Sequence, residues 1–145
     1  MNIQIFGKSK CFDTKKAERF FKERHIKFQS VDLPTKGLSK RELESVLRGV
    51  GGIEKLLDEK HPDAALVKYL LPDAQIEKLL EDPTLMRTPI VRNGQKATVG
   101  EASKAWAEWL KEEILKPYNE ERNKENTIED KKLKGIINKA LRQIQ

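Results

Sequence analysis

The chain has 145 residues, of which 36% are charged, and its mean hydropathy is −0.69. This length suits one domain with a real core, and no apolar run approaches the roughly 20 residues that cross a bilayer. The single cysteine cannot form an internal disulfide, and the N-terminus lacks the apolar stretch of a signal peptide. We therefore expect a cytoplasmic protein with no membrane contact.

The net charge of +6 is concentrated around the cysteine. Residues 8–27 hold eight basic side chains against three acidic ones, a local surplus of +5 that surrounds Cys11. This run is either a solvated helix face or a field that attracts anions to the thiol. Nucleic acid is not an expected partner, because the chain has no zinc-ligand pattern and no aromatic ladder.

The first third of the chain predicts a βαβ unit. Residues 2–6 are β-branched and aromatic and predict a buried strand, and residues 26–33 predict a second one. Between them, residues 11–24 form a helix pattern whose apolar positions are Phe12, Ala17, Phe20 and Phe21. This order predicts two parallel strands with a right-handed crossover.

The middle of the chain predicts helices. Ser39 and Glu42 have the spacing of a capping box at the start of one helix, which a cluster of glycines ends. Residues 53–80 hold three short apolar-periodic pieces broken by prolines, which predicts a small helical subdomain. Asp82-Pro83 closes it.

A β-hairpin follows this subdomain. Two predicted strands, residues 89–92 and 95–99, flank Asn93-Gly94, the preferred pair for a type I′ turn. Pro89 stands at the first residue of its strand, where a proline is tolerated.

The C-terminal part predicts two helices and a linker. Residues 101–116 predict a helix with Trp106 and Trp109 in the core, and Pro117 is expected to stop it. The polar residues 118–127 predict a linker, and the last apolar positions predict a short amphipathic helix: Leu133, Ile136, Ile137, Leu141 and Ile144. Such a helix packs on the parent domain, on a partner protein or on a second copy, because it is marginal alone. We expect a domain over 1–116, then a charged linker and amphipathic helix over 117–145.

Cys11 is the chemically distinctive group of the chain. A free cysteine is often only a small buried hydrophobe, but this one lies where a helix begins. Unpaired N–H groups and the helix dipole stabilise a thiolate there, and neighbouring lysines such as Lys8 and Lys10 favour it further. The Thr14 hydroxyl can donate to the same sulfur, whereas Asp13 opposes the charge or serves as the N-cap. We therefore predict a lowered pKa for the thiol.

The other titratable residues show no site pattern. His25 and His61 stand alone and are expected at the surface, and no metal site is expected. Asp58-Glu59 lacks the paired geometry of an acid–base site.

In this order the elements resemble the thioredoxin-fold arsenate reductase and Spx (ArsC-like) family over about residues 2–115. Residues 11–14, Cys-Phe-Asp-Thr, are similar to the family's Cys-x-x-Ser or Cys-x-x-Cys loop. Residues 82–91 resemble its acidic–Pro segment leading to an arginine, a cis-proline and a strand, and residues 93–101 resemble its closing hairpin. The resemblance implies an α/β, thioredoxin-like fold with a mixed four-stranded sheet, a helical insert and an extra C-terminal helix.

The resemblance also implies roles for particular residues. Cys11 becomes the reactive thiol, Arg87 an oxyanion-binding arginine, and Pro89 a cis-proline preceded by a Thr88 backbone that faces the thiol. The implied anion-binding or supporting residues are Thr14, Lys8, Lys10, Lys96, Thr88 and Pro89. Arsenate-reducing members carry three arginines around an anion pocket. In this chain residues 53–60 and 96–99, where two of them are expected, contain lysine but no arginine. Lysine keeps the positive charge but lacks the paired N–H donors with which arginine binds an oxyanion.

We therefore interpret the chain as a single-thiol redox protein of the arsenate reductase type, acting on a small oxyanion or a disulfide. No bound cofactor is expected, and glutathione with glutaredoxin is the external thiol that the resemblance implies, since Thr14 replaces the second cysteine of Spx. The alternative is a non-catalytic, Spx-like regulatory or protein-binding module. Its basic first helix and its C-terminal helix would then contact a partner, as Spx docks on RNA polymerase. A third interpretation is a protein that resembles the nitrogenase-associated members of the family, which implies little about its chemistry.

Overall fold

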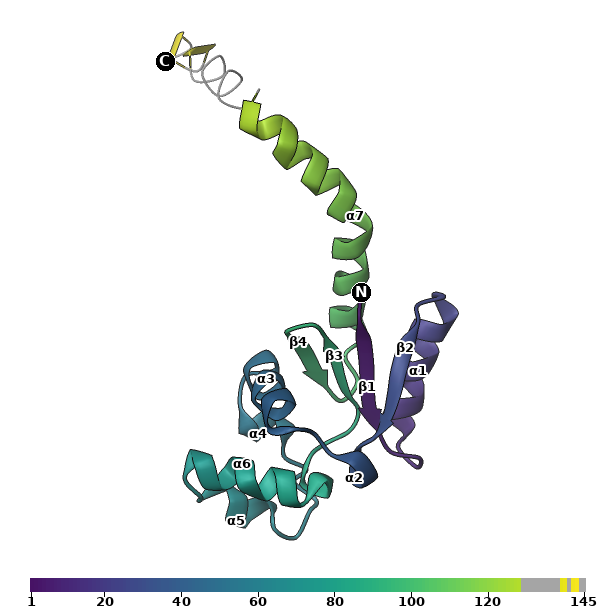
Figure 1. Ribbon diagram of the computed structural model, residues 1–145, viewed down its shortest axis with the longest axis vertical. Coiled ribbons are helices and arrows are strands. Elements are labelled where there is room, and N and C mark those ends of the chain that lie inside the picture. The colour runs from purple at the N-terminus through teal and green to yellow at the C-terminus, as the bar shows by residue number, and fades with distance from the viewer. Residues whose placement is uncertain (129–138, 141, 144–145) are drawn as a thin grey trace. The chain divides into compact units, whose positions relative to one another are not determined.

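The computed structural model describes residues 1–128, 139–140 and 142–143 (Figure 1). Its elements are, in chain order, β1 (Ile3–Gly7), α1 (Phe12–Glu23), β2 (Phe28–Asp32), α2 (Leu33–Lys36), α3 (Lys40–Val50), α4 (Ile53–Leu56), α5 (Ala64–Lys68), α6 (Pro72–Glu81), the 3-10 turn η1 (Pro83–Leu85), β3 (Ile90–Asn93), β4 (Lys96–Val99) and α7 (Ser103–Ile128). Within the described residues, no helix combines the length and the apolar character needed to cross a bilayer.

The four strands form one mixed sheet in the order β2-β1-β3-β4, which confirms the predicted fold class. β1 and β2 are parallel, as predicted for the βαβ unit, and the other two pairings are antiparallel. Phe6 lies opposite Val31 on one side and Ile90 on the other. The loop that follows β1 therefore meets the segment that precedes β3 at one end of the sheet.

Helices cover both faces of the sheet because successive side chains of a strand point to opposite faces. Phe6, Ile90 and Ala97 are buried in a cluster with apolar residues of α3 and of the helical insert. Ile3 and Ile5, on the opposite face, are equally buried, and α1 lies against β1. The insert consists of α4, α5 and α6, which are the three predicted pieces.

The predicted capping box at α3 is confirmed. Ser39 Oγ accepts a hydrogen bond from Glu42 N at 3.2 Å, and Glu42 Oε1 accepts one from Ser39 N at 3.0 Å. At the other end, Gly51 has a φ of 91°, the left-handed conformation that glycine adopts without strain. Near that end α3 approaches β4 so closely that a Cβ on Gly49 would lie 2.9 Å from Ala97 Cβ.

The hairpin forms where predicted, but its turn is shifted by one residue. Asn93 pairs with Lys96, so the two loop residues are Gly94 and Gln95 rather than Asn93 and Gly94. Gly94 has a φ of 61°, and His25 is the one non-glycine residue of the described chain with a positive φ. A positive φ at the first loop position alone matches a type II′ turn, so the predicted type I′ turn is wrong.

The helix stop at Pro117 is also wrong, because α7 continues through this residue to Ile128. The predicted linker over residues 118–127 is therefore helical. Pro117 is exposed, so water can satisfy the carbonyl that loses its N–H partner, and strong helix formers precede the proline over residues 110–113. The apolar positions of the predicted last helix, from Leu133 to Ile144, lie outside the described residues.

The chain divides into two compact units, Met1–Ala105 and a second unit that begins at Trp106. The predicted end of the domain at residue 116 stays a prediction. Trp106 and Trp109 are buried, as predicted. Every residue of the candidate site lies in the first unit.

Candidate active site around Cys11

The backbone places Cys11 at the start of α1. A tight turn follows β1, in which Cys11 N donates to Lys8 O at 3.2 Å, and the Cys11 carbonyl accepts the first helical bond from Lys15 N at 3.3 Å. Cys11 is thus the N-cap residue, with an extended backbone at φ −93° and ψ 118°. The Cys11 thiol makes no well-formed capping hydrogen bond, unlike the serine or aspartate usual at this position, and the backbone N–H groups of Asp13 and Thr14 face the sulfur, where they can donate to the thiolate.

The sulfur faces the segment that enters β3. Cys11 Sγ donates to Thr88 O at 3.5 Å, and the Thr88–Pro89 peptide bond is cis. Both features are those that the family resemblance implied. They follow from the sheet register, because Phe6 of β1 lies opposite Ile90 of β3.

The pKa of the Cys11 thiol is lowered from its ordinary value of 9.0, as predicted. Partial burial is the largest influence and by itself raises the pKa. Hydrogen bonds from the Thr14 and Thr88 hydroxyls, and then from the backbone at Thr14 and Asp13, outweigh the burial. The lysine charges that the sequence suggested are not among these causes, and both Lys8 and Lys10 are exposed.

Thr14 is the buried polar residue of the site. Its hydroxyl oxygen has no well-formed hydrogen bond among the described residues while Cys11 is a thiol, yet it is the first of the groups that lower the thiol pKa. The two observations agree if the thiolate, a stronger acceptor than the thiol, is the partner that the hydroxyl gains on ionisation. Gly7 makes room for this side chain, since a Cβ there would lie 2.2 Å from Thr14 Cγ2.

Arg87 lies next to Thr88 in the chain, but its side chain is directed elsewhere. Its Nη1 donates to Lys55 O at 3.2 Å, and Nη2 lies so close to Gly100 that an added Cβ would approach it to 2.9 Å. The guanidinium makes no hydrogen bond to Cys11 Sγ among the described contacts, and four of its five N–H donors remain for a ligand. Its role as an oxyanion-binding residue stays a prediction.

Lys96 lies at the hairpin end of β4. It pairs with Asn93 at the hairpin end of β3, whereas Ile90, next to Pro89, pairs with Val99. Three residues along a strand correspond to about 10 Å. The register thus places the Lys96 backbone away from the end of β3 that carries Pro89, and the implied supporting role of Lys96 stays a prediction.

Phe12 is exposed directly beside the thiol. Its side chain is 73% exposed, and Lys16 Nζ lies 5.1 Å from the centre of its ring. The helix pattern counted Phe12 among the apolar positions, but the buried stripe of α1 consists of Thr14, Ala17 and Phe21, and Phe12 lies off it. The position of Phe12 outside this buried stripe is the feature of the sequence that could have predicted its exposure.

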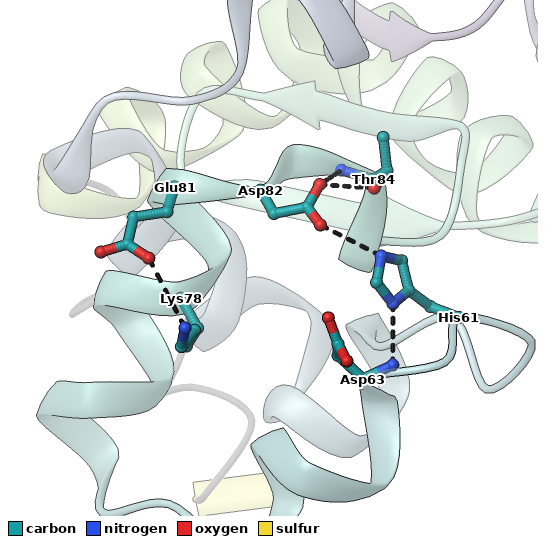
Figure 2. A network of polar contacts seen from close by, with 6 residues as sticks. All are labelled: His61, Asp63, Lys78, Glu81, Asp82 and Thr84. Carbon is teal, nitrogen blue, oxygen red and sulfur yellow. Dashed lines mark hydrogen bonds and ion pairs between the residues drawn. The ribbon is translucent and has the colours of Figure 1, made fainter.

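His61 is not a surface residue, contrary to the expectation. Figure 2 shows its ring between the insert and the segment that leads to Arg87, with 15% of the side chain exposed. Nδ1 accepts from Asp63 N at 3.0 Å, so Nε2 carries the proton in the neutral ring and donates to Asp82 Oδ2 at 3.1 Å. Asp82 Oδ1 accepts from the Thr84 backbone and hydroxyl, and these bonds, with His61, lower the pKa of Asp82.

A backbone pairing reinforces this connection. Asp58 N donates to Leu85 O and Arg87 N donates to Leu56 O, both at 2.8 Å. The insert thus holds the chain just before Thr88, and the His61–Asp82 hydrogen bond adds a side-chain contact to the same segment. Within the described residues no group of three metal-ligating side chains comes together.

The fold and site define a thioredoxin-like domain with one cysteine at a helix start opposite a cis-proline. The sequence profile of the ArsC family matches residues 6–109, and the chain belongs to this family. The fold is similar to that of an arsenate reductase from Vibrio cholerae (TM-score 0.66, 20% identity, 74% of this chain and 97% of that one). It is also similar to an arsenate reductase (ArsC) related protein from Brucella melitensis (TM-score 0.51, 23% identity, 77% and 96%).

A curated relative carries a different kind of name. The chain is 28% identical over 105 residues to the global transcriptional regulator Spx 2 of Oceanobacillus iheyensis, over 69% of this chain and 77% of that protein. The chain is thus similar in fold to proteins named as arsenate reductases and in sequence to a protein named as a regulator.

Proposed function

We propose that this protein is a single-thiol redox enzyme in which the Cys11 thiolate is the nucleophile and an external thiol completes the cycle. The observation that carries the proposal is the Cys11 sulfur itself, which has a lowered pKa and lies 3.5 Å from the carbonyl that precedes cis-Pro89. A lowered pKa raises the thiolate fraction near neutral pH, and the thiolate is the reactive form.

Exchange with a glutathione mixed disulfide, R–S–S–G, proceeds in two balanced steps. The Cys11 thiolate attacks the glutathione sulfur, so a Cys11–S–S–G bond forms and R–S⁻ leaves and takes a proton from water. A glutathione thiolate then attacks that adduct, which forms glutathione disulfide and restores the Cys11 thiolate. The described chain and the full sequence offer no second cysteine for an internal resolving step. The Thr14 and Thr88 hydroxyls hold the negative charge on sulfur between turnovers.

A disulfide suits the site better than an inorganic oxyanion does. The exposed Phe12 ring offers an apolar contact beside the sulfur, which suits a peptide or protein substrate. Three arginines are expected in an oxyanion pocket of this family. Arg87 is present with one donor already used, residues 53–60 supply lysine instead of arginine, and Lys96 lies at the hairpin end of β4. Arsenate is the second substrate to test, because relatives of this fold bear the name arsenate reductase.

The second candidate function is that of a regulator. The observation in its favour is the relative named as a global transcriptional regulator, which matches 69% of this chain. In that case Cys11 would sense oxidants or be dispensable, and a partner protein would be the ligand.

The test is an assay of the wild-type protein with a peptide–glutathione mixed disulfide and glutathione alone and, separately, with arsenate, glutathione and glutaredoxin. Turnover is expected with the mixed disulfide. Cys11→Ser should abolish it while leaving the circular dichroism spectrum unchanged, and Ser9→Ala, an exposed neighbour in the same loop, should retain it. No turnover of either substrate contradicts the enzyme function, and a Cys11→Ser variant that still binds a partner like the wild type supports the regulator.

A further inference from the structure

The strand β2 leaves one edge of the sheet open. β1 pairs with β2 on one side, and no other described strand pairs with it on the other. Figure 1 shows α1 and β2 running beside each other, and a hollow of about 1140 Å³ is lined by both of them and by the turn that joins them. We call this hollow the edge groove.

The edge groove is lined by more cations than carboxylates. Its basic residues are Lys15, Arg19, Lys22 and Lys27, and its acidic residues are Glu18 and Glu23. The first three basic residues recur at steps of four and three, which places them on one face of α1. In the described part of the chain none of the four cations forms an ion pair within 4.0 Å, so direct contacts do not neutralise them.

The backbone of β2 is not protected against pairing. Edge strands are usually blocked by proline, by a bulge or by charged residues within the strand. β2 contains no proline and pairs with β1 over five consecutive residues without a bulge. Its one charged residue, Asp32, lies at its last position, and the uncharged Gln29 and Ser30 are exposed at its centre. Its outward N–H and C=O groups therefore lack a strand partner beside a basic helix face.

We propose that the edge groove binds an extended acidic peptide segment of a partner protein, which adds to β2 as a fifth strand. Main-chain hydrogen bonds to β2 supply affinity, and the cations of α1 select acidic side chains. The spacings are comparable, because alternate residues of a strand repeat every ~6.6 Å and the turns of a helix every ~5.4 Å, a difference that long lysine and arginine side chains can span. A peptide of about five residues covers the length of β2.

The edge groove continues toward the thiol loop. A smaller hollow shares Lys15, Glu18 and Ser30 with it and extends to Gly7, Lys8 and Ser9, just before Cys11. A peptide bound along β2 would thus run toward this loop. The inference does not depend on the proposed redox chemistry, since no residue that contacts the Cys11 sulfur lines the larger hollow.

The test is an NMR titration of the ¹⁵N-labelled full chain with an acetylated, amidated Glu-Val-Glu-Val-Glu peptide. The expected result is a set of shift changes in β2 and α1, together with slower hydrogen exchange of the outward β2 amides. A Lys-Val-Lys-Val-Lys peptide should produce neither. The double variant Arg19→Glu/Lys22→Glu should weaken binding roughly tenfold, while Lys40→Glu/Arg41→Glu, an exposed basic pair on α3, should change it less than about twofold.

Four results would overturn the proposal. They are an absence of binding up to the solubility limit of the peptide, an equal response to the lysine peptide, shift changes on α1 without protection of the β2 amides, and tighter binding of single-stranded oligothymidine at the same residues. The last result would identify a nucleic-acid surface instead, and its steep dependence on salt would mark it.

Discussion

At Cys11, partial burial raises the thiol pKa and hydrogen bonds from neighbouring residues lower it. Thr14 supplies the first of these bonds, and Thr14→Val removes its hydroxyl while keeping the shape of the side chain. We expect the thiol pKa to rise and the rate of iodoacetamide alkylation at neutral pH to fall roughly fivefold, which corresponds to the loss of about 1 kcal/mol. Ser9→Ala is the control. If Thr14→Val and the wild type show the same dependence of alkylation rate on pH, the Thr14 hydroxyl does not lower the thiol pKa.

The same pKa shift makes stability depend on pH. Because the native pKa of Cys11 lies below the unfolded value of 9.0, ionisation stabilises the native state. This contribution is fully present above about pH 9.0 and is lost as the pH falls through the lowered native pKa. Urea unfolding of the wild type and of Cys11→Ser should therefore show a stability difference that shifts in favour of the wild type as the pH is raised across this window. A difference that stays constant with pH contradicts the shift.

Among the elements, the helical insert is connected to the segment before β3 by the His61–Asp82 hydrogen bond. His61→Ala and Asp82→Asn should each destabilise the protein by about 0.5–1.5 kcal/mol, because each removes a hydrogen bond between a largely buried ring and a carboxylate that is 42% exposed. A double-mutant cycle measured by urea unfolding should give a coupling of about 0.5–1.5 kcal/mol. The control is the exposed Lys78–Glu81 pair, also drawn in Figure 2, whose coupling should not exceed about 0.5 kcal/mol.

The hydrogen bonds that Asp82 accepts from Thr84 and His61 should also make the stability of the protein depend on pH. The native pKa of Asp82 lies below its ordinary 3.8, chiefly because the Thr84 hydroxyl donates to the carboxylate. Its contribution to stability is present above about pH 3.8 and is lost as the pH falls through the lower native pKa. The stability gap between the wild type and Asp82→Asn should close in that acidic range. A gap that persists there would show that the carboxylate charge is not what matters.

Local patterns predicted most of the elements, because their causes lie within a few residues. The capping box of Ser39 and the strands β1 and β2 are such cases. The hairpin turn was misplaced because Asn93-Gly94 fits two turn positions, and the burial of Ile90 and Ala97 decides between them. His61 was misjudged for a related reason, since its partner Asp82 lies 21 residues away along the chain.

The sequence predicted those features of the site that depend on the order of the elements along the chain. Cys11 at a helix start and Thr88 before a cis-proline were found from the sequence and the resemblance. The position of Lys96 depends on strand register, which the sequence does not fix. The exposure of Phe12 was not predicted, because the helix pattern counted it among the apolar positions although it lies off the buried stripe of α1. The cause of the thiol pKa shift, hydrogen bonding rather than lysine charge, needs side-chain geometry.

At the scale of the whole molecule, every residue of the proposed site precedes Pro117. Deleting residues 118–145 should therefore leave kcat/KM for a mixed disulfide within about twofold of the wild type, because the variant keeps Cys11, Thr14 and Thr88. The measurement is steady-state turnover together with the melting temperature. A truncated chain that stays folded but loses turnover would place part of the site beyond Pro117, and one that only loses a partner in a pull-down would support the regulator.

The ArsC fold alone does not decide between enzyme and regulator, since this chain is similar to proteins named as either. The Cys11 sulfur does, and the most direct measurement traps its adduct. Wild-type protein mixed with a peptide–glutathione disulfide, without free glutathione, should gain the mass of one glutathionyl group at Cys11 and release one equivalent of peptide thiol. Added glutathione should then remove the adduct. No adduct at Cys11, or equal thiol release by Cys11→Ser, would contradict the account.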